Sequence, residues 1–299
     1  MKSKYVVKKD YHNTRFDRWF KHNVSDIPQS LIEKLIRKNK IKVNKKKTKT
    51  KYRVQSNDQI EIFNLEKIKH RKKSEIKLYI PSEKEKKTYG SFVIENNDNF
   101  IVINKPAGTP VQSGTKSFKN IIDILKNTEY FNNSKPFIVH RLDKETSGVM
   151  IVAKNREYAQ LLTSLFRIRK IHKLYIAVTH GSVNKELQVM KDDLILHEKN
   201  RKVIQKAISY IKVLKSNNKY SFVELKPITG RKHQLRKQLF NIGHPVVGDD
   251  KYSFKDSRNI KNLLLHAYKI KFMINNNKYN YKADYGDSFK NFIKNNIKS

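Results

Sequence analysis

The chain has 299 residues, of which 37% are hydrophobic and 31% charged, and a net charge of +38. That length allows one large domain, or a moderate domain with a small appendage, and the charge indicates a polyanionic partner such as nucleic acid. The absence of cysteine excludes disulfides, thiol catalysis and thiolate-bound zinc or iron–sulfur clusters.

The first residues, MKSKYVVKKDYH, contain no apolar core of signal-peptide length. No stretch approaches the roughly 18 apolar residues that span a bilayer. We therefore expect a soluble cytoplasmic protein with no membrane partner.

Residues 12–63 are predicted to form a small α+β module. An amphipathic stretch at residues 16–20 precedes a helix at residues 31–38, whose apolar side chains recur at helical spacing. Ser30 is the expected N-cap of this helix, and Glu33 stands three residues later, in capping-box position.

Two short strands follow, at residues 41–43 and 58–62, with a turn beginning at Asn44. The highly charged residues 64–88 are predicted to be a linker, with a possible short strand at residues 76–80.

A larger domain is predicted over residues 89–299, where short apolar runs alternate with polar clusters. The expected strands cover residues 100–103, 149–152, 174–178 and 220–225, and the expected helices cover residues 120–125, 157–166 and 233–240. Strands outnumber helices and do not alternate regularly with them. The fold class is therefore α+β, with a mixed, largely antiparallel sheet.

Three polar clusters lie between the apolar runs, at residues 104–108, 140–148 and 229–249. The middle cluster leads directly into a buried strand and contains Asp143, an acid between two cations in a chain that has few acids. A fixed carboxylate in a basic groove suits chemistry on a nucleotide. Taken alone, these residues would more often form a structural loop pair between Asp143 and a nearby arginine.

The third cluster contains a helix that places Arg236 at the margin of its apolar stripe, within reach of a cleft. Arg141, Arg231 and Arg236 are three of only 13 arginines. Their planar guanidinium groups suit paired contacts with a carboxylate, although ordinary phosphate contacts would also explain them.

Metal and nucleotide cofactors are not expected. His140, His233 and His244 have no HExxH context or carboxylate partners at ligand spacing, and neither GxGxxG nor GxxxxGK[ST] occurs.

Residues 140–148, HRLDKETSG, resemble the HRLDxxTSG signature of the RluA/RluC/RluD-type family of RNA pseudouridine synthases. The accompanying motifs of that family are matched in order by NKPAG at 104–108, KLYIA at 173–177, TGRKHQLR at 229–236, GHPVVGD at 243–249 and LHA at 265–267. Residues 14–62 resemble an S4 RNA-binding domain, except that Asn39 and Lys45 stand where glycine is usual.

The resemblance implies roles for residues at matching positions. Asp143 would be the catalytic aspartate and Arg236 would pair with it, while Tyr175 would pack against the target base and act as general base for the C5 proton. Arg141 would displace the target nucleotide, and Leu265 would pack the pocket. The residues expected to bind substrate or RNA are Lys105, His140, Arg141, Arg231, His233 and Leu265, with Arg37 and Lys45 in the S4-like module. Without the motif, Tyr175 would be interpreted as a core aromatic residue.

The implied reaction breaks the N1–C1′ bond of uridine, turns the uracil and joins C5 to C1′. It requires no cofactor, and Asp143 would either attack C1′ or remove the 2′ proton. The S4-like module and the length resemble the RluC branch, which acts on large-subunit ribosomal RNA, and a monomer is expected. The alternatives are an inactive RNA-binding or ribosome-assembly protein of the same fold, a synthase acting on tRNA, another RNA-modifying enzyme, or a DNA-binding protein.

Overall fold

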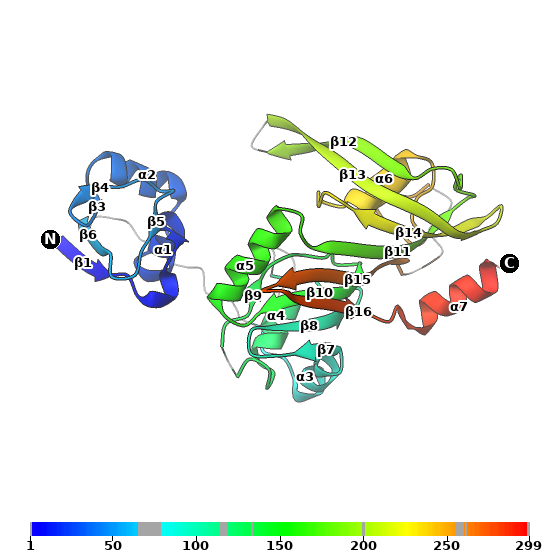
Figure 1. Ribbon diagram of the computed structural model, residues 1–299, viewed down its shortest axis with the longest axis horizontal. Coiled ribbons are helices and arrows are strands. Elements are labelled where there is room, and N and C mark those ends of the chain that lie inside the picture. The colour runs from blue at the N-terminus through cyan, green and yellow to red at the C-terminus, as the bar shows by residue number, and fades with distance from the viewer. Residues whose placement is uncertain are drawn as a thin grey trace. The chain divides into compact units, whose positions relative to one another are not determined.

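The computed structural model describes residues 2–64, 79–113, 119–132, 134–198, 201–254, 260 and 262–297. The chain divides into two compact units, Met1–Lys77 and Leu78–Ser299 (Figure 1). Within the described residues, no helix is long and apolar enough to cross a membrane.

The first unit contains a four-stranded sheet, in the order β1-β6-β3-β4, a two-stranded sheet of β2 and β5, and two helices that share one core with the strands. Its core contains Phe16, Trp19, Phe20 and Ile32, each at most 1% exposed. The elements are β1 (Lys2–Val6), the 3-10 helix η1 (Lys9–Tyr11), β2 (Thr14–Arg15), α1 (Phe16–Asn23), α2 (Gln29–Arg37), β3 (Ile41–Val43), β4 (Lys46–Lys47), β5 (Arg53–Val54) and β6 (Gln59–Phe63).

Two predictions for this unit are wrong. The unit begins before residue 12, because β1 pairs antiparallel with β6 along its whole length. Helix α2 begins at Gln29 with Pro28 as N-cap and no side-chain cap, so Ser30 does not form the expected capping box with Glu33. The Pro28 carbonyl accepts the first helical hydrogen bonds instead, and the ring of Pro28 fixes the extended backbone that enters the helix.

The turn between β3 and β4 has positive φ at both central residues, 49° at Asn44 and 62° at Lys45. The Asn44 side chain stabilises it, donating to Asp58 Oδ1 at 2.8 Å and accepting from the Gln59 backbone N–H at 2.8 Å. Lys45 thus adopts the conformation for which glycine is usual, and its side chain is exposed at the tip of the turn.

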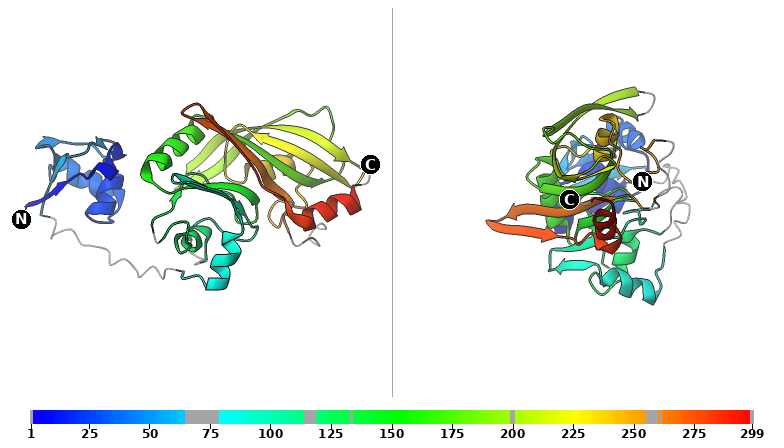
Figure 2. Two further views of the ribbon diagram at one scale, coloured as in Figure 1. Left: turned by 60° about the horizontal axis from the view of Figure 1, so that its bottom comes forward. Right: turned by 90° about the vertical axis from the view of Figure 1, so that its right-hand side faces the viewer.

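The second unit contains a ten-stranded sheet in which β12-β13-β14-β11-β15-β10-β8-β7 form the main path, with β16 paired to β15 and β9 to β10. Its elements are α3 (Glu83–Gly90), β7 (Val93–Asn96), β8 (Phe100–Lys105), α4 (Ile121–Lys126), β9 (Phe137–Ile138), β10 (Ser147–Ala153), α5 (Arg156–Arg167), β11 (His172–His180), β12 (Val189–Glu198), β13 (Arg201–Ser216), β14 (Tyr220–Pro227), α6 (Gln234–Asn241), β15 (Leu265–Ile274), β16 (Asn277–Lys282) and α7 (Gly286–Asn296). Figure 2 shows the β15–β16 hairpin projecting from the sheet.

The predicted fold class is confirmed, because β10 and β15 are parallel and the other paired strands of this sheet are antiparallel. The predicted linker extends too far, because α3 lies inside it and belongs to the second unit. A capping box between Ser82 and Glu85 starts this helix. The possible strand at residues 76–80 falls mostly outside the described residues.

The parallel contact between β10 and β15 joins two halves of the sheet and requires glycine at residue 148. Gly148 has φ of +113°, and a Cβ atom there would lie 2.3 Å from the carbonyl oxygen of Ala267 on β15. Any side chain would force the two strands apart.

We therefore expect Gly148→Ala to lower the free energy of unfolding by about 3 kcal/mol or more, from backbone strain plus the clash. Gly243→Ala is the matched control, since φ is +81° there but nothing lies within 4 Å of the added atom. It should cost only about 1–2 kcal/mol. Urea unfolding of both variants checks this, and equal losses would contradict the close strand contact.

Candidate active site

A cavity of about 1030 Å³ opens where the two halves of the sheet meet. Three neighbouring strands supply its walls: Asp143 lies in the loop before β10, Leu265 begins β15, and Tyr175 lies on β11. Arg236 reaches the cavity from α6. The sheet thus brings together four of the predicted site residues, which lie far apart in the sequence.

The Asp143 loop is fixed from behind by Lys105, at the end of β8. The Lys105 ammonium is fully buried and donates to the carbonyl oxygens of Pro106 at 2.7 Å, Thr109 at 2.9 Å and Lys144 at 3.1 Å. Burial lowers the pKa of Lys105 to about 7, although Glu145 and Asp143 oppose the change. The prediction that Lys105 contacts RNA is therefore wrong. This lysine braces the loop that carries Asp143.

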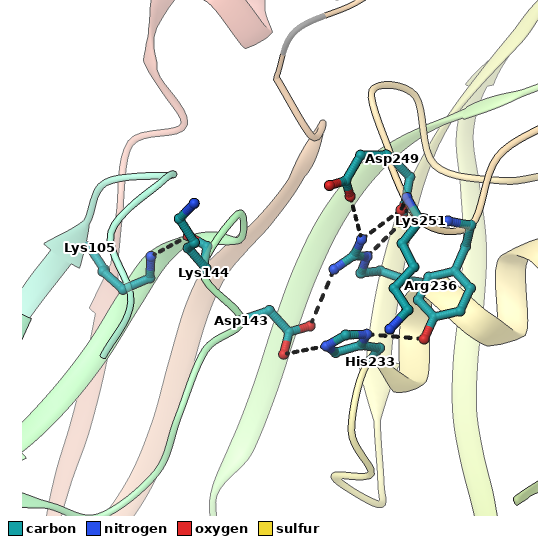
Figure 3. A network of polar contacts seen from close by, with 9 residues as sticks. Lys105, Asp143, Lys144, His233, Arg236, Asp249 and Lys251 are labelled. Atoms are coloured by element: carbon teal, nitrogen blue, oxygen red, sulfur yellow. Dashed lines mark hydrogen bonds and ion pairs between the residues drawn. The ribbon is translucent and has the colours of Figure 1, made fainter. Parts of the chain in front are cut away.

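The Asp143 carboxylate faces the Arg236 guanidinium and the His233 imidazole without a close hydrogen bond to either. Its Oδ2 lies 4.0 Å from Arg236 Nη1 and its Oδ1 lies 3.7 Å from His233 Nε2, with 30% of the side chain exposed (Figure 3). Both distances exceed ordinary hydrogen-bond lengths. The oxygen lone pairs therefore remain available to a group that enters the cavity.

Arg236 is held mainly by Asp249 rather than by Asp143. Two parallel hydrogen bonds of 2.6 Å join the Arg236 guanidinium to the Asp249 carboxylate, and both side chains are at most 5% exposed. Figure 3 shows Asp143 and Asp249 approaching the guanidinium from different sides. The predicted pairing with Asp143 is thus a long contact, and Asp249, which had no individual role in the sequence interpretation, fixes the guanidinium.

The loop after Asp249 also orients His233. Asp249 Oδ1 accepts the backbone N–H groups of Lys251 and Tyr252 at 2.9 Å each. The Tyr252 hydroxyl contacts His233 Nδ1 at 3.1 Å, which leaves Nε2 facing Asp143. His233 adopts a positive φ of 54° at the start of α6, and burial lowers its pKa, with Arg236 acting the same way and Asp143 opposing.

Tyr175 lies where the pairing of β11 with β15 shifts register, between Leu174 and Ile176. Such irregularities redirect side chains next to active sites. Tyr175 packs against both cores that flank the junction and lines the cavity. Burial raises its pKa, and the charge of Asp143 raises it further, so the neutral phenol is favoured.

His140 lines the cavity and also supports the loop, so its contact with the substrate stays a prediction. Its Nε2 accepts the backbone N–H of Ile151 at 2.9 Å, and its ring stacks on Phe166 with centroids 4.5 Å apart. An acceptor nitrogen requires the neutral ring, and burial lowers the pKa to about 3, with Lys173 acting the same way.

This histidine predicts a loss of stability in mild acid. His140 takes up a proton near pH 6.5 in the unfolded chain but only near pH 3 in the folded chain. The stability that neutral His140 contributes to the folded state is therefore full above pH 6.5 and declines as the pH falls. We expect the free energy of unfolding to be about 2 kcal/mol lower at pH 5 than at pH 7.5. His140→Gln keeps an acceptor for Ile151 and should flatten this dependence. An unchanged pH slope in urea unfolding would contradict the assignment.

The cavity is strongly basic. Asp143 is its only carboxylate among the described residues, and its lining cations include Arg141, Arg167, Arg169, Lys173, Arg231 and Arg236. Arg141 is exposed, and Arg231 donates through Nε to the Lys206 carbonyl at 3.2 Å.

In the first unit, Arg37 and Lys45 are exposed at the end of α2 and at the β3–β4 turn. Within the described chain, no group of His, Asp or Glu is placed to hold a metal ion.

Comparison with known proteins agrees with this geometry. A model of RNA pseudouridylate synthases matches residues 99–241, and a model of the S4 domain matches residues 27–60. The chain is 33% identical to ribosomal large subunit pseudouridine synthase C of Buchnera aphidicola, covering 89% of this chain and 88% of the relative. It is 36% identical to the protein of the same name from Rickettsia conorii, covering 86% and 88%.

Among solved structures, human RNA Pseudouridylate Synthase Domain Containing 4 aligns with a TM-score of 0.60 at 27% identity, covering 70% of this chain and 94% of that chain. A fold and cavity assembled from the family's motifs, together with more than 30% identity over most of both chains, lead to one assignment: this chain belongs to the RNA pseudouridylate synthase family.

Proposed function

We propose that the protein isomerises uridines of large-subunit ribosomal RNA to pseudouridine, as a cytoplasmic monomer without a cofactor, and that Asp143 is its catalytic residue. The observation that supports this most directly is the Asp143 carboxylate, the only one that lines the basic cavity in the described chain. The names of the relatives, which are ribosomal large subunit pseudouridine synthases, support the choice of RNA.

The geometry of Asp143 supports a role at the ribose. Its carboxylate is partly exposed to the cavity and lacks a close hydrogen bond, so it can attack C1′ or accept the 2′ proton. Arg236 and His233 are close enough to stabilise the charge that shifts during N1–C1′ cleavage. Because Asp249 and Tyr252 fix these two groups beforehand, little reorganisation is needed at the moment of reaction.

Tyr175 is assigned to pack against the extruded base. The neutral phenol offers an aromatic face inside the cavity, next to Leu265. The expected role as general base would require a phenolate, which burial and the charge of Asp143 both disfavour. A water molecule or Asp143 itself is a better acceptor for the C5 proton.

The basic surfaces would bind the RNA around the target. Extruding a base costs a few kcal/mol, least in loops, and phosphate contacts offset that cost. We assign exposed Arg141 to displacing the target nucleotide, and Arg231 and the exposed cations of the S4 unit to phosphate contacts.

Arg37 and Lys45 test the S4 contribution. We expect the double variant Arg37→Gln/Lys45→Gln to weaken binding to all RNA sequences and to reduce the slope of log Kd against log salt by about 1–2. Filter binding at several salt concentrations measures this. An unchanged slope would show that neither side chain contacts phosphate.

The deciding experiment is incubation of purified protein with unmodified large-subunit ribosomal RNA, followed by pseudouridine mapping. We expect conversion at discrete uridines by wild type and none by Asp143→Asn. Conversion of tRNA alone would replace the proposed substrate with tRNA, and conversion of neither RNA would favour a binding protein of the same fold.

A further inference from the structure

Lys173 is a cation in the cavity to which the described residues supply no counterion. It lies on β11, two residues before Tyr175, and its partly buried side chain lines the cavity. Within the described part of the chain, its ammonium makes no hydrogen bond or ion pair. The charged group that acts on it is another cation, Arg169, just beyond the end of α5.

This arrangement is unfavourable in the empty protein. Burial lowers the pKa of Lys173, and Arg169 lowers it further. Partly buried charges are normally paired, because removing an ion from water costs several kcal/mol unless an opposite charge compensates. Asp143 does not compensate it, since the charge of Asp143 affects the pKa values of Lys105, Tyr175, His233, Arg236 and Tyr252 but is no cause of the shift at Lys173. The site therefore favours binding of an external anion.

The backbone opposite leaves space for that anion. Gly230 lies beside the ammonium, where a Cβ atom would be 3.9 Å from Lys173 Nζ, and its φ is outside the left-handed region. Its backbone conformation is thus open to other residues. Because Gly230 has no side chain, the space beside the Lys173 ammonium stays free.

We propose that Lys173 and Arg169 bind one phosphodiester next to the target uridine. This rests on the proposed function for the identity of the anion. Residues two apart on a strand are separated by about 7 Å, so a base against Tyr175 would have a neighbouring phosphate within reach of Lys173. The pair would fix the strand on one wall of the cavity while Asp143 acts from the other.

The first test uses inorganic phosphate and needs no turnover. In protein labelled with ¹³C at lysine Cε, the Lys173 signal is assigned by its loss in Lys173→Met. Phosphate should shift this signal and raise the Lys173 pKa, because the anion favours the ammonium. Lys271, an exposed lysine on neighbouring β15, is the comparison and should respond weakly. Equal responses of the two lysines would overturn the site.

The second test uses a stem–loop RNA that contains a uridine converted by the wild-type protein. Methylphosphonates replace, one at a time, the phosphates on each side of that uridine. Loss of one charged contact should reduce kcat/KM on the order of tenfold for wild type at one of the two positions. Lys173→Met should show the same loss on natural RNA and no further loss at that position. Lys173→Arg should recover most activity, and Lys271→Met should behave as wild type.

The outcomes separate the two proposals. If the effects of Lys173→Met and of both methylphosphonates multiply, the phosphate site is wrong although the enzyme is active. If wild type converts no uridine in ribosomal RNA, the proposed substrate is wrong, and the response to inorganic phosphate alone decides the site.

Discussion

Replacing Asp143 with Asn should abolish uridine isomerisation while leaving RNA affinity within a few-fold of wild type. Asn has the same shape but is a poor nucleophile and a poor base, so either route at the ribose is blocked. Removal of a group that acts directly in the chemistry typically costs about 10⁴-fold or more in kcat. Affinity should persist because the cavity loses its only carboxylate in the described chain and keeps its cations.

Single-turnover release of tritium from RNA labelled at uridine C5 measures the chemistry, and filter binding measures affinity. Asp193→Asn, an exposed position on β12, makes the same chemical change outside the cavity and should keep full activity. Wild-type turnover in Asp143→Asn would remove Asp143 from the mechanism. A parallel loss of affinity would assign it to RNA binding instead.

Local sequence signals were sufficient for the parts of the site that depend on local structure. The loop containing Asp143 and the helix containing Arg236 were predicted because polar clusters there interrupt apolar runs. The α4 and α5 helices were predicted at nearly their observed bounds, and Asn120 and Asn155 cap them. Short-range periodicity and capping chemistry determine such elements.

Contacts between residues that lie far apart in the sequence could not be predicted from local sequence patterns. Lys105 has the sequence context of an RNA-binding cation, but its burial depends on how β8 packs beneath the Asp143 loop. The pairing of Arg236 with Asp249 depends on the path of the loop after α6. Strand β1 was missed because its partner β6 lies more than fifty residues away. A motif identifies which residues matter, and the tertiary structure determines which of them touch.

Asp249 holds the Arg236 guanidinium, so replacing Asp249 should strongly reduce the rate of the reaction. Asp249→Asn should reduce kcat about 100-fold and change KM for RNA only a few-fold. Asn cannot accept both guanidinium hydrogen bonds, so buried Arg236 would lose its main partner. Asp250 is 3.3 Å from Arg236 Nη2 but 80% exposed, so it would be a weak replacement, and Nη1 would turn toward Asp143, which lies 4.0 Å away. A direct ion pair would then occupy the oxygen lone pairs that the reaction needs.

General loss of structure must be separated from this effect, because breaking a buried ion pair can cost about 3–5 kcal/mol. Thermal melting establishes the folded fraction at the assay temperature, and Tyr252→Phe provides a milder change. That variant removes only the hydroxyl that contacts His233 at 3.1 Å, and should reduce kcat several-fold without unfolding.

The double variant Arg236→Lys/Asp249→Asn decides whether Asp249 acts through Arg236. Lysine cannot form the two parallel hydrogen bonds, so Arg236→Lys already removes the guanidinium group that Asp249 holds in place. If Asp249 only positions the guanidinium, the double variant should be no slower than Arg236→Lys alone, since residues that act as a unit are not additive. If the two losses in kcat multiply instead, Asp249 contributes independently of Arg236. Asp249 would then affect the cavity through its hydrogen bond to the backbone of Tyr252.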